Sequence, residues 1–219
     1  VRNEESQPFR LQLLGPNRKS VLGKTQRIAI DFTIECRGNN AKVVLQDQEI
    51  DLDLGRWSDW QSVVFKIGPL TKMHGVVQFL LVETEPEFKL YVSPISLDPR
   101  QPYFPISHPP GYSRELVTEL GLYATRGMPF DTWALNEARI TQAQFLAHTE
   151  RLLADNTDLT MFELSRFVQG VFFSYFEYSD IMQHMYWHYQ DPKHPLYEPD
   201  APKVRSEERR VGKECATGC

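Results

Sequence analysis

Residues 170–194 read GVFFSYFEYSDIMQHMYWHYQDPKH, and they decide how the rest of the chain is interpreted. Their first part, 171–178, is an apolar and aromatic run typical of strands that are buried on both faces of a parallel sheet. The next residues recur at helical spacing, and Ser179 and Asp180 are good helix N-caps. The stretch therefore predicts a buried strand followed directly by a helix, at the edge where open α/β sheets bind ligands.

Asp180 and His184 are the candidate metal ligands of this stretch. A separation of four residues stacks both side chains on one helix face, so that a carboxylate oxygen and an imidazole nitrogen can share one ion at about 2 Å each. The spacing alone is a weak signal, because Asp180 can simply cap the helix while His184 faces water. His184, His188 and His194 are three of the six histidines, and this density favours a metal half-site.

Three segments resemble a known family: YFEYSDIMQHMYWHYQDPKHPLY (175–197), LYVSPISLDPRQPYFPISHPPGYS (90–113) and GLYATRGMPFDTWALNE (121–137). They are similar to the alkaline phosphatase superfamily, in particular to its type I phosphodiesterase/nucleotide pyrophosphatase-like members, the predicted phosphohydrolases or phosphomutases. In that family an Asp-x3-His pair supplies two ligands of one of two catalytic metals, and these positions fall on Asp180 and His184. His188 stands where relatives carry a basic residue, so the resemblance gives it no ligand role.

The resemblance implies that the chain is a fragment of a metal-dependent phosphoric ester hydrolase that acts on a small phosphorylated substrate. Two divalent metal ions would serve the full-length enzyme, and a carboxylate with an imidazole suits Zn²⁺ best, with Mn²⁺ as the main competitor. The family's nucleophile would lie before Val1, and further ligands would follow the chain, since it contains no Asp-His dipeptide. No catalytic residue is therefore assigned, and the fragment alone is expected to be inactive.

Composition indicates a globular protein, with 41% hydrophobic and 24% charged residues. The net charge of −5 includes no long charged block, so no nucleic-acid polymer is expected as a partner, and no apolar run is long enough to span a membrane. Cys36 is the only cysteine before residue 215, which slightly favours a cytoplasmic protein. The chain starts at Val1 rather than at Met, so export stays open.

The order of patterns along the chain predicts an α/β fold with a β-rich, sandwich-like module at 1–87. The resemblance implies that 88–204 belong to an alkaline-phosphatase-like catalytic domain and that 1–87 are an insertion in it. Alternating segments separated by Gly, Pro and Asn predict strands at 9–14, 27–36, 42–46, 62–67, 76–83 and 88–95. The segment RSEERRVGKEC at 205–215 resembles a translated sequencing adapter. We therefore interpret 205–219 as a non-native tail without chemistry.

After Pro110 the pattern changes to helical spacing. Ser113 and Asp131 are expected to cap two short helices. Thr141 and Gln144 form a capping-box pattern before one long or two broken helices, and His148 is expected on the solvated side.

A rival hypothesis needs no enzyme chemistry. Trp57 and Trp60 lie close together near a turn and could stack on a sugar in a β-sandwich interaction or carbohydrate-binding module that carries a helical extension. More often, such tryptophans only close the end of a sandwich. A complete metalloenzyme built from Asp180, His184, His188 and His194 is disfavoured, because prolines restrain the loop around His194.

Overall fold

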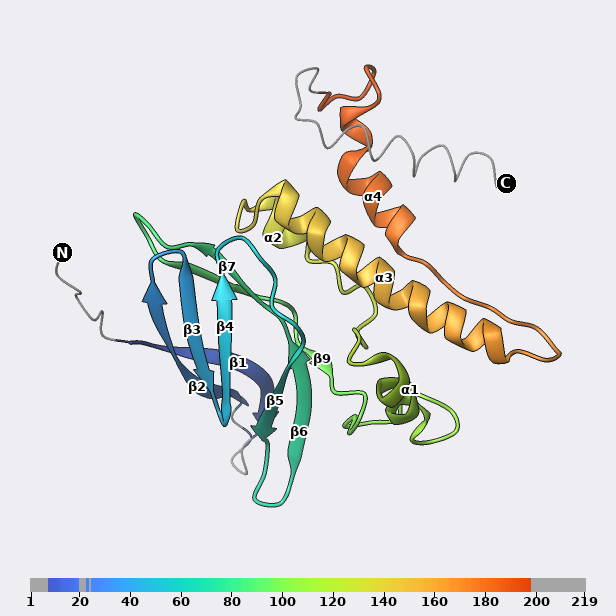
Figure 1. The fold of residues 1–219 in the computed structure, drawn as a ribbon, viewed down its shortest axis with the longest axis horizontal. Helices are drawn as coiled ribbons and strands as arrows, with labels where there is room; N and C mark the ends of the chain where they lie inside the picture. The colour runs from blue at the N-terminus through green and yellow to red at the C-terminus, as the bar shows by residue number, and fades with distance from the viewer. Residues whose placement is uncertain (1–7, 20–22, 24, 198–219) are drawn as a thin grey trace. The chain divides into compact units, whose positions relative to one another are not determined.

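The computed structural model describes residues 8–19, 23 and 25–197, and its strands and helices are labelled in Figure 1. The chain divides into two compact units, Val1–Pro129 and Phe130–Cys219. The first unit holds all the described strands and helix α1 (Tyr112–Leu120), and the second holds the other three α-helices. Within the described ranges, none of the helices combines the length and the apolar character that crossing a bilayer requires.

The first unit is built from three antiparallel sheets. Hairpin-connected neighbours form the largest sheet, because short turns join strands whose side chains alternate between core and water. That sheet contains, in order, β1 (Phe9–Lys19), β2 (Thr25–Arg37), β3 (Asn40–Leu45) and β4 (Gln48–Asp53). The second contains β5 (Gln61–Lys66), β6 (Lys72–Val77) and β9 (Ser96–Leu97), and the third pairs β7 (Phe79–Glu83) with β8 (Lys89–Val92).

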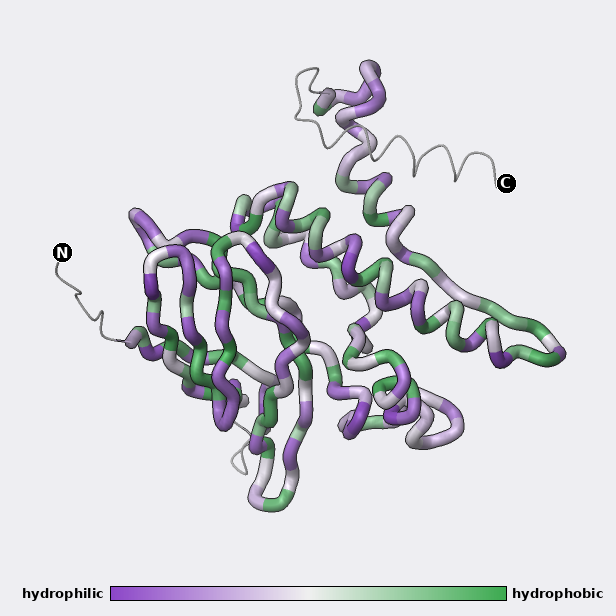
Figure 2. Tube along the Cα trace, viewed as in Figure 1, coloured by the Kyte–Doolittle hydropathy of each residue, from purple (hydrophilic) through white to green (hydrophobic). Residues whose placement is uncertain are grey.

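One hydrophobic core joins these sheets. Alternate residues of β2, β3 and β4 point into it, among them Ile34, Val43 and Leu52, and they pack with buried residues of β5 and β7 such as Phe65 and Phe79. Because the residues between them face outward, each strand needs only one apolar face. Figure 2 shows the resulting alternation of hydrophobic and hydrophilic residues along the strands.

Two glycines allow close packing in this unit. Gly15 lies where the pairing of β1 with β2 is irregular, and a Cβ atom there would overlap the buried ring of Phe65 on β5. Gly75 is buried on β6, and a Cβ atom there would lie 2.8 Å from Ile95 Cγ2 and 3.1 Å from the carbonyl oxygen of Ser96. Both positions require the absence of a side chain for steric reasons.

The Pro-rich segment before α1 is tied to the β-sheets by polar contacts. Buried Asp98 pairs with Arg100, whose Nη2 lies 2.6 Å from Asp98 Oδ2 and also donates to Ser62 Oγ on β5. The side chains of Ser113 and Arg114 donate to the carbonyl oxygens of Pro99 and Arg100, at 2.7 and 2.9 Å. Ser113 therefore anchors α1 instead of capping it as predicted, and Gly111 occupies the N-cap position.

The second unit contains α2 (Thr132–Asn136), α3 (Gln142–Arg166), α4 (Tyr178–Tyr186) and the short 3₁₀ helix η1 (Trp187–Tyr189). Asp131 caps α2 by accepting from the backbone N–H of Ala134, as predicted. Thr141 and Gln144 form the predicted capping box, and α3 continues from it as one helix of 25 residues. The local start signals of both helices were therefore read correctly from the sequence.

The strand predicted at 171–178 is absent from the structure. Residues 171–177 form an extended segment outside any sheet, and Val171 and Phe173 are 93% and 84% exposed. This segment follows α3 in Figure 1, and Figure 2 shows its hydrophobic character. The prediction failed because a strand buried on both faces needs a neighbouring strand on its edge, and the described part of the second unit contains none.

The α/β fold class is corrected by the same finding. The named strands pair only as antiparallel neighbours. The described residues thus form a β-rich fold of three antiparallel sheets, and they contain no parallel sheet of the kind expected in an alkaline-phosphatase-like catalytic domain. The expected boundary at 87/88 falls between β7 and β8, which pair as one hairpin, whereas the two units divide at 129/130. The tail interpreted as non-native, 205–219, lies outside the described residues.

Candidate metal half-site on helix α4

Helix α4 presents Asp180 and His184 to solvent because its apolar residues occupy the other side. Ile181, Met182 and Tyr186 are buried, and Tyr186 packs its ring against Phe145 of α3 at a centroid distance of 6.3 Å. The helix begins at Tyr178, with Glu177 as the N-cap residue and without a side-chain cap bond. Ser179 and Asp180 therefore lie inside the helix rather than at its cap, so the carboxylate of Asp180 is not used for capping.

The two candidate ligands face each other. His184 Nε2 lies 3.5 Å from Asp180 Oδ1, and the side chains are 75% and 59% exposed. A nitrogen and an oxygen bound to one tetrahedral ion at about 2.0–2.1 Å are about 3.3 Å apart, so the observed separation already fits two ligands of a shared metal. The structure therefore places the two side chains within reach of each other, and metal binding by them stays a prediction.

The neighbouring polar residues do not complete a metal site. His194 Nδ1 accepts the backbone N–H of Leu196 at 3.1 Å, and Asp191 Oδ1 accepts that of Lys193 at 2.9 Å, so both side chains stabilise their own loop. The ring of His188 packs against that of Tyr189 in a tilted arrangement, with centroids 3.9 Å apart. Across the described residues, no group of three or more His, Cys, Asp or Glu side chains is arranged to hold a metal ion.

His148 differs from its prediction. It lies on α3 and is only 4% exposed, so it belongs to the interior rather than to the solvated face. Burial is the main cause that lowers the pKa of His148 to about 4; the nearby positive charge of Arg151 acts in the same direction, and Asp131 opposes both. Polar residues interrupt the apolar pattern of α3 around His148. The pattern therefore did not indicate that His148 lies on the buried face of the helix.

The tryptophans of the rival hypothesis are half-buried. Trp57 packs edge-to-face against Tyr91 of β8, with ring centroids 5.6 Å apart, and this contact uses part of the indole for packing inside the first unit. Such a contact is what a structural tryptophan makes at the end of a sandwich. Sugar or peptide binding by Trp57 and Trp60 stays a prediction.

Sequence reasoning missed a cluster of basic residues in the first unit. Lys72, His74 and Arg114 line one hollow, although Arg114 lies forty or so residues further along the chain. The signal that was present is the alternation on β6, which places Lys72 and His74 on the same face of the strand. The placement of Arg114 at the same hollow depends on tertiary contacts of the Pro-rich segment, which no local pattern reveals.

Comparisons of the chain with protein-family models, with curated proteins and with solved structures found no match.

Proposed function

We propose that this chain is part of a metal-dependent phosphoric ester hydrolase, in which Asp180 and His184 are two ligands of one divalent metal ion. The observation that carries the proposal is the 3.5 Å separation of His184 Nε2 and Asp180 Oδ1 on an exposed helix face. A carboxylate oxygen with an imidazole nitrogen is a donor set suited to Zn²⁺, and Mn²⁺ is the competitor. The resemblance of residues 175–197 to type I phosphodiesterases supports the same assignment.

The chemistry of the two side chains suits this role. A bound divalent ion would neutralise charge on a phosphoryl group and lower the pKa of a bound water. The residues of this chain would hold the ion: the carboxylate of Asp180 supplies negative charge, and neutral His184 supplies a nitrogen lone pair. Placement one helical turn apart fixes their separation, because the α4 backbone and the buried Ile181 and Tyr186 hold the helix in place.

A metal titration tests the assignment directly. Zn²⁺ and Mn²⁺ are titrated by calorimetry into the 219-residue chain with its three cysteines replaced by serine, so that thiolates do not contribute. We expect weak binding at one site, lost in Asp180→Ala and in His184→Ala. His108→Ala is the matched control, because His108 is an exposed histidine in the first unit. Equal binding by the wild type and both α4 variants contradicts the proposal.

A turnover assay tests the second part of the proposal, that this chain contributes metal ligands but no nucleophile. We expect the purified chain with saturating Zn²⁺ or Mn²⁺ to hydrolyse bis(4-nitrophenyl) phosphate at a rate close to that of the metal alone. Robust turnover that depends on Asp180 would show that a complete active site is present and would refute this part.

A further inference from the structure

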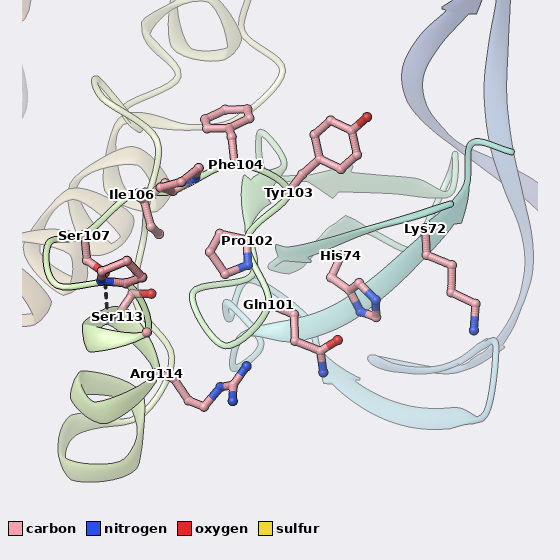
Figure 3. Close-up of a pocket in the computed structure, with 13 residues that line it drawn as sticks. Lys72, His74, Gln101, Pro102, Tyr103, Phe104, Ile106, Ser107, Ser113 and Arg114 are labelled. Carbon is pink, nitrogen blue, oxygen red and sulfur yellow. Dashed lines mark hydrogen bonds between the residues drawn. The ribbon is translucent and has the colours of Figure 1, made fainter. Parts of the chain in front are cut away.

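The structure assigns a second ligand site to the first unit: we propose that a hollow beside β6 and α1 binds a small phosphorylated compound that carries a ring, such as a mononucleotide. The hollow has a volume of about 510 Å³ and is formed by β6, the Pro-rich segment and the start of α1 (Figure 3). Its size lies in the range of small-molecule sites. The proposal is independent of the Asp180–His184 pair, which belongs to the other unit.

The lining of this hollow is positively charged. Lys72 and Arg114 supply the charge, His74 lies in the same lining, and none of the described residues that line it is Asp or Glu. Lys66 stands directly opposite Lys72 in the β5–β6 pairing and therefore projects from the same face of the sheet. Like charges in such a pair repel, and an anion between or beside them removes that cost. This local excess contrasts with the net charge of −5 for the whole chain.

The basic side chains are held toward the hollow by the fold. Met73, between Lys72 and His74, faces the opposite way and packs against the hydrophobic core, so the two basic residues are directed outward. Arg114 Nε donates to the carbonyl oxygen of Arg100 at 2.9 Å, which fixes the guanidinium while its two terminal nitrogens bond to no other described residue. In Figure 3 the side chains of Lys72, His74, Gln101 and Arg114 extend to the same side.

Affinity for an anion must come from these side chains rather than from the α1 backbone. The backbone N–H groups of Tyr112, Ser113 and Arg114 already donate to Pro109, to the Ser107 hydroxyl and to Gly111. A phosphate would therefore be bound by charge-assisted hydrogen bonds from the basic side chains of the lining, and lysine and arginine are the two side-chain types that best recognise phosphate oxygens.

Two aromatic side chains explain the ring in the proposed ligand. Tyr103 and Phe104 line the same hollow and are 52% and 58% exposed, with their rings edge-to-face at a centroid distance of 6.5 Å. Figure 3 shows them on the opposite side of Pro102 from the basic side chains. A ligand with a phosphate at one end and a planar ring at the other matches this division, because an exposed aromatic surface gains free energy when a ring covers it.

Binding of AMP to the 219-residue chain, measured by calorimetry with EDTA present, tests this site without any contribution from metal. We expect saturable binding that weakens with added salt, and about a tenfold loss of affinity in each of Lys72→Gln and Arg114→Gln. Arg10→Gln is the matched control, because Arg10 is an exposed cation on β1 of another sheet. This control should bind AMP as the wild type does.

Two further measurements make the outcome decisive. Inorganic phosphate should bind more weakly than AMP, and Tyr103→Ala with Phe104→Ala should bring the two affinities together. Circular dichroism melting of each variant identifies any loss of fold. The side chains of Lys72, Tyr103, Phe104 and Arg10 make no hydrogen bond within the described residues. The variants at these four positions should therefore melt close to the wild-type temperature. Absence of AMP binding, or equal binding by the wild type and the Lys72→Gln/Arg114→Gln double variant, overturns the proposal.

Discussion

Acidification should destabilise the second unit through His148. Burial holds the pKa of this side chain at about 4, below its ordinary value of 6.5, so the unfolded chain binds a proton that the folded chain rejects between these two pH values. The contribution of His148 to the free energy of unfolding is therefore fully present above about pH 6.5. It decreases as the pH falls from 6.5 to about 4 and changes little below that. A tenfold difference in proton affinity corresponds to about 1.4 kcal/mol, so the loss amounts to about 3 kcal/mol.

Urea unfolding at a series of pH values measures this loss. Circular dichroism at 222 nm follows mainly the second unit, because three of the four described α-helices lie there. The His148→Gln variant cannot titrate at this position, so its free energy of unfolding should depend less steeply on pH than that of the wild type, with the difference approaching about 3 kcal/mol at pH 4. The matched control is His108→Gln, at an exposed histidine of the first unit. Identical slopes for the wild type and His148→Gln would refute the reasoning.

Three other substitutions probe packing and exposure. Gly75→Ala should lower the free energy of unfolding by about 1–3 kcal/mol, because the new methyl group would press on Ile95, and calorimetric melting measures the loss. Asp98→Asn should cost a similar amount, about 1–3 kcal/mol, because it removes the buried partner of Arg100, and chemical denaturation measures it. Phe173→Ser should change stability by less than about 0.5 kcal/mol and reduce aggregation in light scattering, since the ring is exposed in an apolar segment.

For each of these substitutions, the same kind of change at a site with weaker contacts serves as the matched control. Gly68→Ala should be tolerated better than the change at position 75, because its nearest contact would be an ordinary 3.5 Å to Thr71. Asp53→Asn, in an exposed ion pair, should have a smaller effect than the change at position 98. Phe172→Ser should cost more stability than Phe173→Ser, because Phe172 packs against Phe167. Equal effects within any of these pairs would contradict the structural explanation.

Patterns confined to a few residues were predictable from the sequence. The alternation of Ile28, Ile30, Phe32 and Ile34 located β2, whose observed bounds are Thr25–Arg37. β4 was missed because QEIDLD has only two large apolar residues, although both Ile50 and Leu52 point into the core. The strand predicted at 76–83 is divided between β6 and β7, since buried Gln78 bonds to Ser58 and Ser93 at the junction.

Features that depend on distant parts of the chain could not be predicted in this way. The apolar run at 171–178 matches a buried strand, yet its composition does not specify which strand would pair with it. By contrast, the facing arrangement of Asp180 and His184 requires only that the backbone be helical, so the spacing was sufficient. The basic hollow was not predicted because its residues come from β6, the Pro-rich segment and α1, and α1 is positioned by hydrogen bonds between distant residues, from Arg114 to Arg100 and from Arg100 to Ser62 of β5.

Gly15 of the four-stranded sheet lies against the ring of Phe65, which belongs to the sheet of β5, β6 and β9. The side chains at positions 15 and 65 therefore compete for the same space. A larger residue at 15 becomes acceptable only when residue 65 shrinks, so Gly15→Ala should be rescued in part by Phe65→Leu although each change alone is harmful. The effects of substitutions at these two positions, fifty residues apart, are therefore expected to be non-additive.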